Sequence, residues 1–381
     1  MNETTTPDRR ELRTLLLSAS LGGGHQKAGE ALSEALGDAV PGYNAVHIDY
    51  LEYLTPLQRG ATAGVYMWWL KYSPASYRFF YNWTNRENEW KIITAGFGTA
   101  GLSRLARDLR RTRPHLVISS YTAPVTLADT ARKRLKMNFL NVELVTDYSA
   151  HHHWARPEAD VFLVATDAVK ADLVHWGMNP EKIAVTGIPI MPRVANLVGA
   201  EKAPLRERFG LDPEDPVVLV SAGAQGTYRG VDEVVAACAA AGGRVQVLLL
   251  AGSGWVGTEQ VGGATVHRLG YTRFFPELLA ASDLVVGKAG GLTVAEALTL
   301  GVPMLVYEPI PGQEEGNARY LESMGAALWA HSPWELRRDL LTLLGDSARR
   351  DAMSRAARAI SRPDAAHVAA RELVRRVEAL Q

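Results

Sequence analysis

Short apolar segments alternate with amphipathic segments of helical period along most of the chain. Apolar runs of about four to eight residues predict buried strands, and apolar positions three or four residues apart predict helices. We expect strands within residues 14–19, 43–48, 115–120, 141–146, 161–166, 182–187, 216–223, 245–252, 265–270, 284–290 and 302–307. Because strands that alternate with helices form parallel sheets, the pattern predicts an α/β fold.

Two domains are expected from the length and from the spacing of these segments. A chain of 381 residues is too long for one ordinary core. Residues 188–210, rich in Pro and small side chains, separate the two sets of strands and predict a linker. We expect domains at 1–195 and 205–362, as two Rossmann-like doubly wound units facing each other across a cleft. A helical pattern begins near Pro363, and we expect segment 363–381 to pack back near the N-terminal domain.

Composition and charge narrow the class of protein. With 47% apolar and 22% charged residues, the composition is typical of soluble globular proteins. The 41 basic residues balance the 41 acidic ones, so the chain has no net positive charge that would indicate nucleic-acid binding. The single cysteine, Cys238, excludes an internal disulfide and lies in an apolar helical pattern that favours a buried thiol over a nucleophile. Residues 1–13 lack the apolar core of a signal peptide, and no stretch reaches the ~18 apolar residues that cross a bilayer. We therefore expect a cytoplasmic protein that works at a membrane only from its surface.

Three glycines and a histidine, Gly22–His25, lie between the first strand and the first predicted helix. Consecutive glycines destabilise regular structure and indicate that backbone N–H groups approach a partner closely. The loop is neither a dinucleotide fingerprint, because Lys27 stands at the third glycine position, nor a Walker A loop. A helix N-terminus favours anions and keeps a nearby imidazole neutral, which suits His25 as a general base. A simple packing turn explains the motif equally well at this point.

Glycines and polar residues also follow several strands of the second half. Gly223, Gln225 and Gly226 follow one strand, and Lys288 to Gly291 follow another and lead into a helix near Thr293. Carboxyl ends of parallel strands are where α/β folds bind ligands. Glu296 falls in the first turn of that helix, and the next loop carries Gln313, Glu314 and Asn317. An ordinary crossover does not explain polar and glycine positions on consecutive loops.

The segment "KAGGLTVAEALTLGVPMLVYEPIPGQEEGN" resembles the glycosyltransferases that make monogalactosyl- and glucosyl-diacylglycerol, whose pattern is "KAGPGT-AEAL---G-P------PGQE--N". More distantly it is similar to the enzyme that adds N-acetylglucosamine to lipid-linked muramyl-pentapeptide. "SASLGGGHQKAGEAL" is similar to the family opening "GGGHxxxAxAL", and "VTDYSAHHHWARPEAD…GIPI" follows its "TDxxxHxxW…D…GIPI" block. One departure is Gly291-Leu292, where plant galactolipid enzymes tend to have Pro-Gly.

The resemblance implies an inverting enzyme of the GT-B fold, with a lipid acceptor in the N-terminal domain and a UDP-sugar in the C-terminal domain. The implied reaction moves a hexose to diacylglycerol or to glycosyl-diacylglycerol. On the donor side the resemblance places Gly223, Gln225, Gly226, Lys288, Ala289 and Gly290 at the diphosphate, Glu296 at the ribose, Gln313, Glu314 and Asn317 at the sugar hydroxyls, and Gly270, Tyr271 and Phe274 around the uracil. On the acceptor side it places Gly23, Gly24, His153 and Trp154.

No cofactor and no metal are expected. The sequence contains no Asp-x-Asp triplet, so the leaving UDP is expected to rely on backbone donors, helix dipoles and Lys288. The three consecutive histidines His151–His153 suggest a metal site. Because adjacent side chains project in different directions, a metal site is the less favoured interpretation. Inversion needs a base on the acceptor side. His25 is the first candidate and Asp147 the second, either alone or as a partner of a histidine.

Residues 66–90 contain ten of the thirty aromatic residues, interleaved with basic side chains. Such a mixture suits the headgroup boundary of a membrane, and a core helix or a dimer contact is the alternative. The residues expected at the membrane are Trp68, Trp69, Phe79, Phe80 and Trp83. Nine basic residues within 104–136 fit an anionic membrane surface or, equally, a solvated helix face.

Three other functions stay open on sequence alone. They are transfer of N-acetylglucosamine to another lipid-linked acceptor, a UDP-sugar 2-epimerase of the same fold, and a binding protein without catalysis. The residues do not choose between glucose, galactose and N-acetylglucosamine, which differ by one hydroxyl orientation or substituent, and they predict no oligomeric state.

Overall fold

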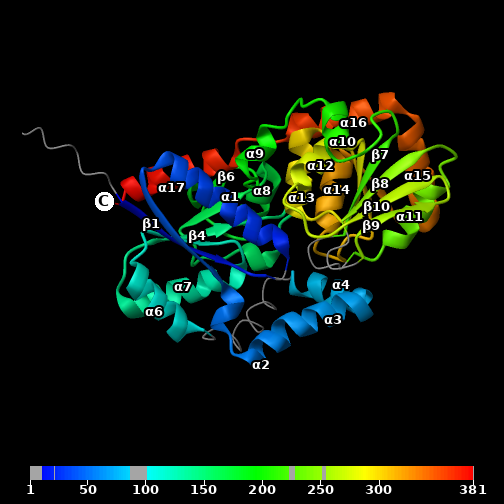
Figure 1. Cartoon of the computed structure of the whole chain (residues 1–381). Helices are drawn as coiled ribbons and strands as arrows, with labels where there is room; N and C mark the ends of the chain where they lie inside the picture. The colour runs from blue at the N-terminus through cyan, green and yellow to red at the C-terminus, as the bar shows by residue number, and fades with distance from the viewer. Residues whose placement is uncertain (1–10, 21, 86–100, 223–227, 251–254, 381) are drawn as a thin grey trace, which may run out of the picture.

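Two parallel sheets form the cores of two α/β domains (Figure 1). The computed structural model describes residues 11–20, 22–85, 101–222, 228–250 and 255–380. The first sheet has the order β2-β1-β3-β4-β5-β6 and is parallel throughout. The second has the order β13-β12-β11-β7-β8-β10-β9, and only β9 is antiparallel among its described strands. The predicted α/β class with two doubly wound domains is confirmed.

The strands and helices alternate along the chain. The strands are β1 (Glu11–Ser18), β2 (Gly42–Asp49), β3 (Leu116–Ser119), β4 (Leu140–Leu144), β5 (Val161–Val164), β6 (Ile183–Val185), β7 (Val217–Ser221), β8 (Val245–Leu250), β9 (Gly257–Val261), β10 (Ala264–Leu269), β11 (Leu284–Gly287), β12 (Met304–Tyr307) and β13 (Ala327–Ala330). The helices are α1 (Gly23–Ala39), α2 (Pro56–Arg59), α3 (Val65–Tyr72), α4 (Pro74–Thr84), α6 (Leu102–Thr112), α7 (Thr122–Leu135), α8 (Asp167–His175), α9 (Pro192–Ala195), α10 (Lys202–Arg208), α11 (Val231–Ala239), α12 (Phe275–Ala281), α13 (Gly291–Leu300), α14 (Glu315–Ser323), α15 (Pro333–Gly345), α16 (Ser347–Ile360) and α17 (Ala365–Glu378).

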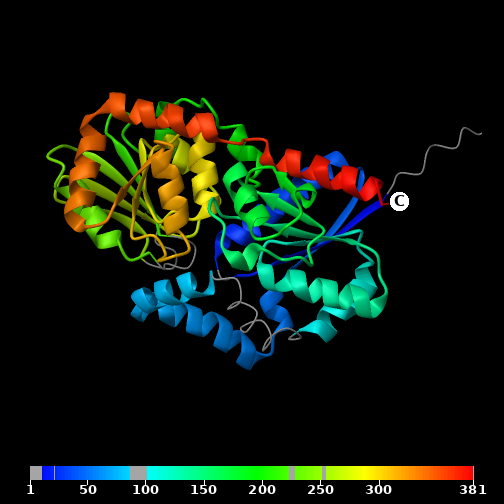
Figure 2. The same ribbon diagram turned by 180° about the vertical axis from the view of Figure 1, so that it is seen from behind.

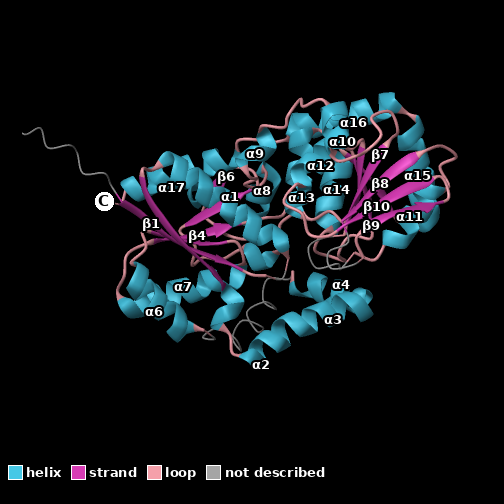
Figure 3. Ribbon diagram, viewed as in Figure 1, coloured by secondary structure: helices cyan, strands magenta, loops and turns pink. Residues whose placement is uncertain are grey.

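Each predicted strand is present, and two further strands were not predicted. The central strands β3, β5, β7 and β11 are buried along their whole length, because helices cover both faces of each sheet (Figure 3). The sequence of β9 alternates exposed and half-buried residues at the edge of its sheet, and β13 has only four residues. β9 therefore lacks the continuous apolar run of the buried strands, whereas β13, Ala-Leu-Trp-Ala, has such a run and was overlooked.

The last helix, α17, lies against α1 of the N-terminal domain, although it follows the C-terminal domain in sequence (Figures 1 and 2). Its apolar stripe, which includes Ala369 and Leu373, is buried. At its ends His367 Nε2 lies 3.6 Å from Asp38 Oδ2, and Arg376 donates a 2.7 Å hydrogen bond to the carbonyl of Glu181. The predicted domain boundaries themselves stay predictions. No helix in the described part of the chain combines the length and apolar character that crossing a bilayer requires.

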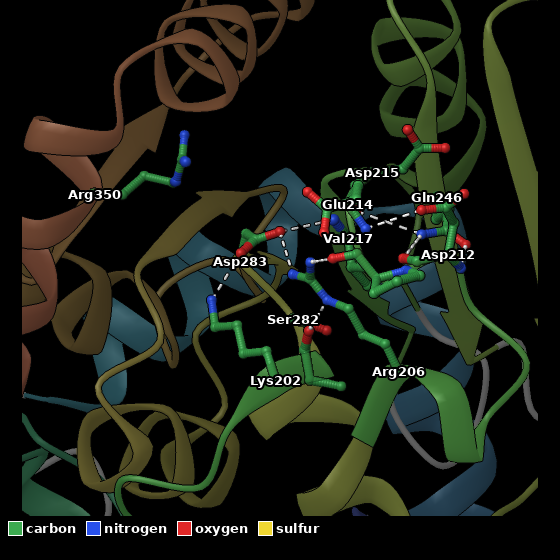
Figure 4. Close-up of polar contacts among 12 residues, drawn as sticks. Lys202, Arg206, Asp212, Glu214, Asp215, Val217, Gln246, Ser282, Asp283 and Arg350 are labelled. Atoms are coloured by element: carbon green, nitrogen blue, oxygen red, sulfur yellow. Dashed lines mark hydrogen bonds and ion pairs between the residues drawn. The ribbon is translucent and has the colours of Figure 1, made fainter. Parts of the chain in front are cut away.

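A buried ion pair fastens the linker helix α10 to the C-terminal sheet (Figure 4). Arg206 lies 2.6 Å from Asp283 and also donates hydrogen bonds to the carbonyls of Ala281 and Pro213. Asp283 accepts a further bond from the backbone N–H of Val217, where β7 begins. The network therefore holds the end of the linker against the starts of β7 and β11.

Replacing Arg206 by Met is expected to lower the free energy of unfolding by about 3 kcal/mol, because the carbonyls of Ala281 and Pro213 lose their donor, and Asp283 keeps Lys202 but loses its buried partner. The same change corresponds to a drop in Tm of roughly 6–12 °C for a domain of this size. Thermal unfolding followed by circular dichroism measures it. Arg208→Met, on the exposed side of the same helix, is the control and is expected to cost less than about 1 kcal/mol. Equal Tm values for the two variants would contradict the role of the buried pair.

Candidate active site

A cavity of about 860 Å³ lies between the two domains. It is bounded on both sides by loops that follow the carboxyl ends of parallel strands, such as β1, β3 and β4 of one sheet and β10, β11 and β12 of the other. The predicted site residues that line it are Gly23, Gly24, His25, Asp147, His153, Trp154, Gly270, Tyr271, Lys288, Gly290, Glu296, Gln313 and Glu314. The structure thus gathers both candidate bases and much of the predicted donor side around one space, while the role of each residue stays a prediction.

Some predicted site residues lie elsewhere. Ala289 and Asn317 are fully buried behind the cavity wall, so neither side chain lines the cavity. Phe274 also lies outside the lining, where its ring packs 6.1 Å from that of Phe209. The predicted diphosphate residues Gly223, Gln225 and Gly226 lie outside the residues that the structure describes.

His25 projects into the cavity from the first turn of α1, which begins at Gly23. Its Nδ1 lies 2.8 Å from the hydroxyl oxygen of Thr146 on the loop after β4. The pKa of His25 is lowered to about 4, mainly by burial and in small part by the charge of Lys288, while a hydrogen bond with the Ser120 backbone acts in the opposite direction. The helix N-terminus also opposes a positive charge on the ring. His25 is therefore neutral at physiological pH.

Asp147 lies on the loop after β4, three residues beyond its last residue Leu144, and is buried against the other domain. Its Oδ1 accepts a 3.3 Å hydrogen bond from the side-chain amide of Asn317. Burial raises the pKa of Asp147 to about 7; the bond from Asn317 opposes this rise and the charge of Glu314 adds to it. A carboxyl group that titrates near neutral pH is well matched to accept a proton in catalysis.

Hydrogen bonds connect His151 and His153, two further histidines that line the cavity. The Nε2 atom of His151 lies 2.8 Å from the carbonyl oxygen of Tyr81, and a carbonyl only accepts, so this nitrogen carries the hydrogen. Burial lowers the pKa of His151 to about 4, so its ring is neutral and its Nδ1 is an acceptor. The backbone N–H of His153 donates to this Nδ1 at 3.1 Å, and Nδ1 of the His153 ring lies 2.6 Å from it.

No group of three or more His, Cys, Asp or Glu side chains in the described part of the chain is arranged to hold a metal ion. On the donor side, α13 begins at Gly291 directly beside the cavity. The first N–H groups of a helix have no partner within the helix, so this end offers donors and a partial positive charge to an anion. The Nζ atom of Lys288 lies 3.1 Å from Glu314 in the same wall.

Glu296 lines the cavity from the second turn of α13, not from the first turn as predicted, because the helix begins at Gly291 and not near Thr293. Burial raises its pKa to about 8, while the charges of Arg193 and Lys27 act in the opposite direction. At neutral pH the carboxyl group of Glu296 is thus protonated in most molecules. A protonated carboxyl both donates and accepts hydrogen bonds, which fits a diol such as that of ribose.

The two domains touch at the base of the cavity. A Cβ atom on Gly291 would lie 1.9 Å from the carbonyl oxygen of Thr146, so only glycine fits at the start of α13. The side chain of Asn317 donates to the carbonyl of Ala289 at 2.9 Å and accepts from the N–H of Tyr148 at 2.7 Å. Asn317 thus joins the loop that carries Asp147 to the loop that carries Lys288, and its amide is used in these contacts.

Helices α3 and α4 form a hairpin that reaches from the N-terminal domain beneath the C-terminal domain (Figure 1). One face of the hairpin lines the cavity with Tyr66, Trp69, Leu70, Tyr77, Phe80, Tyr81 and Thr84. Of the residues predicted at the membrane, Trp68 and Phe79 point outward with 57% and 75% exposure, whereas Trp69 and Phe80 face the cavity and Trp83 is half-buried. The aromatic run therefore has two faces.

Several cavity residues were not predicted from the sequence. Thr146, the partner of His25, carries no signal of its own. For Tyr66, Tyr77 and Tyr81 a signal exists, since cavity-lining positions in the aromatic run recur three or four residues apart.

Comparisons with known proteins agree with this arrangement. Residues 25–190 match the family described as monogalactosyldiacylglycerol (MGDG) synthase, and residues 217–369 match the glycosyltransferase family 28 C-terminal domain. The processive diacylglycerol β-glucosyltransferase of Bacillus subtilis (strain 168) is 28% identical over 341 residues, which cover 88% of this chain and 87% of that protein. MurG of Acinetobacter baumannii superposes with a TM-score of 0.60 at 15% identity, covering 96% of this chain and 99% of that one. Anabaena Alr3699/HepE, solved with UDP-glucose, gives a TM-score of 0.58 at 15% identity, with 97% and 100% covered. These likenesses show a shared fold, and the predicted two-domain architecture is confirmed.

Proposed function

This chain belongs to the glycosyltransferases that join an MGDG synthase domain to a family 28 C-terminal domain, and on that premise we propose that it moves a hexose from a UDP-sugar to diacylglycerol or to a glycosylated diacylglycerol. The observation that supports this most strongly is the pair of unlike walls of the cavity. One wall presents a helix N-terminus and Lys288, which suit a diphosphate. The other presents the aromatic face of the α3–α4 hairpin, which suits an apolar acceptor.

The proposed reaction is a direct displacement at the anomeric carbon. The acceptor hydroxyl oxygen forms a bond to that carbon while the bond to the UDP oxygen breaks, so the configuration inverts and UDP leaves. The charge that develops on UDP is stabilised by the first N–H groups of α13 and by Lys288, which are already in place before the reaction. No metal is required in this proposal.

Of the two candidate bases, Asp147 is assigned the proton of the attacking hydroxyl. Its pKa of about 7 gives it both a large deprotonated fraction and a useful affinity for the proton at neutral pH. His25, with a pKa of about 4, stays neutral and is the weaker base. We assign His25 to orienting the acceptor beside Asp147, through its bond with Thr146.

We also propose that the protein works at a membrane surface. The outward face of the hairpin exposes Trp68, Tyr72 and Phe79. Helix α6 lies on the same side of the molecule and exposes Arg107 and Arg110 (Figures 1 and 2). Aromatic side chains insert at the headgroup boundary, and each basic side chain near an anionic leaflet contributes about 1 kcal/mol.

The double variant Trp68→Ser/Phe79→Ser is expected to bind vesicles at least about tenfold more weakly than the wild type, because two apolar side chains no longer enter the bilayer. Flotation with vesicles of phosphatidylglycerol and phosphatidylcholine measures the bound fraction. Trp334→Ser is the matched control, since Trp334 is 68% exposed but lies on α15 of the other domain. Undiminished vesicle binding by the double variant would exclude the hairpin as the membrane contact.

The proposed function is tested by incubating the protein with vesicles that contain diacylglycerol and, in turn, UDP-glucose, UDP-galactose and UDP-N-acetylglucosamine. We expect a glycosyl-diacylglycerol of inverted configuration, identified by mass and by the anomeric NMR signal, in excess EDTA as well as without it. Loss of turnover with EDTA would overturn the metal-free mechanism. A changed nucleotide sugar formed without lipid would select a 2-epimerase, and nucleotide binding without any product would select a binding protein.

A further inference from the structure

Gln313 of the donor domain is in contact with two tyrosines of the other domain. It lies on the loop between β12 and α14 and lines the cavity. Tyr66 of α3 and Tyr77 of α4 donate their hydroxyl hydrogens to the same atom, Oε1 of Gln313, at 3.4 and 3.3 Å. The partners are 247 and 236 residues apart in sequence, so the contact exists only because the hairpin reaches across the cleft. Both distances are longer than the usual O–H···O bond, and one acceptor serves two donors.

Two further contacts hold the hairpin against this loop. Arg78 of α4 forms a 2.6 Å ion pair with Glu315, the first residue of α14. The ring of Tyr81 packs on Gly312, where a Cβ atom would lie 2.7 Å from the ring and where φ is +77°. The loop from Gly312 to Glu315 is therefore clamped from outside by α4, with the two tyrosine hydroxyls directed at Gln313.

The hydroxyl groups can act only as donors to this oxygen. Burial raises the pKa of Tyr66 well above its ordinary value and raises that of Tyr77 as well, so both phenols keep their protons. An amide oxygen has two lone pairs and accepts both bonds. With Oε1 turned toward the tyrosines, the planar amide must turn its NH₂ group away from them. Gln313 is thus fixed as a hydrogen-bond donor to whatever lies next to it in the cavity.

We propose that Tyr66 and Tyr77 are positioning residues that orient Gln313 toward a hydroxyl oxygen of the donor hexose, so that the acceptor domain completes the sugar subsite of the donor domain. This inference rests on the proposed function, in which Gln313 contacts the sugar. It has two consequences. UDP alone binds without help from the hairpin, whereas the extra affinity of a UDP-hexose, and the choice between hexoses that differ in one hydroxyl, depend on the two phenols.

The test compares nucleotide binding and sugar choice in the double variant Tyr66→Phe/Tyr77→Phe and the wild type. By calorimetric titration, the Kd of UDP is expected to stay within about twofold, while that of the preferred UDP-hexose rises roughly five- to tenfold. The ratio of kcat/KM values for UDP-glucose and UDP-galactose is expected to move toward one by a similar factor. Tyr43→Phe is the matched control, because that hydroxyl bonds to Ser33 at 2.8 Å and does not line the cavity.

A double-mutant cycle separates positioning of Gln313 from a general structural effect. In a Gln313→Ala background the two Tyr→Phe changes are expected to have no further effect on UDP-hexose binding. Additive losses in that background, or a double Phe variant that binds and selects UDP-hexoses as the wild type does, would overturn the inference while leaving the proposed function intact. If the wild type binds neither UDP nor any UDP-sugar, the proposed function fails and the inference fails with it.

Discussion

Replacing Asp147 by Asn is expected to lower kcat by about two to four orders of magnitude while UDP-sugar binding changes little. Asn keeps the size of the side chain and its place beside Asn317, but it cannot take the proton of the attacking hydroxyl. Single-turnover transfer of labelled sugar to diacylglycerol in vesicles measures the chemical step directly. Asp351→Asn, an exposed change on α16, is the control and is expected to leave the rate unaltered.

The pH dependence of the wild type identifies which group is the base. Only the deprotonated carboxylate accepts a proton, so with a pKa of about 7 for Asp147 the rate is expected to rise between pH 6 and 8 and then level off. A base with the pKa of His25, about 4, would give a rate that is already constant over that range. A flat profile from pH 6 to 8, together with an active Asp147→Asn variant, would assign the proton to His25 instead.

Gly291→Ala is expected to reduce kcat/KM by at least about 100-fold, although the change adds only one methyl group. The new Cβ atom would lie 1.9 Å from the carbonyl oxygen of Thr146. That oxygen belongs to the backbone and cannot swing aside as a flexible side chain can, so the loop after β4 must move away from the start of α13. Thr146 contacts His25 and adjoins Asp147, and displacement of reacting groups by about 1 Å costs catalysis about two orders of magnitude.

The matched control for Gly291→Ala is Gly345→Ala, at the end of α15, where no atom lies within 4 Å of the added carbon. Both variants are measured for transfer and, by circular dichroism, for thermal unfolding. We expect both variants to fold and only the Gly345 variant to keep the activity of the wild type. Full activity of Gly291→Ala would show that the contact between the domains does not hold the site together.

The fold was predictable because the pattern that encodes it is local. The strands of both sheets, such as β3 and β11, are continuous apolar runs, and each is buried on both faces as such a run requires. The two strands that were missed, β9 and β13, are the edges of the second sheet. Partial exposure removes the apolar run from β9, whereas β13 is a short apolar run that was overlooked. The two-domain division followed from the linker composition, since α9 and α10 occupy the Pro-containing stretch between the sheets.

The site was predictable only in part. The glycine loops carry a local sequence signature, from which His25, Lys288 and Glu296 were predicted as site residues. All three line the cavity. Contacts between residues far apart in sequence carry no such signature, so the bonds from Asn317 to Asp147 and from Thr146 to His25 were not foreseen.

The aromatic hairpin shows the same limit of local patterns. Its composition indicated a surface for lipid, but Trp69 and Phe80 face the cavity because the hairpin packs across the cleft. A helix that is aromatic on both faces serves two environments, and only the tertiary structure separates them.

The most direct test of the central claim is a crystal structure of the protein with bound UDP. We expect the diphosphate at the start of α13, within hydrogen-bond distance of the backbone N–H groups near Gly290 and of Lys288, with the uracil beside Tyr271. UDP bound away from the cavity between the two sheets, or bound there with its phosphates turned away from α13, would contradict it.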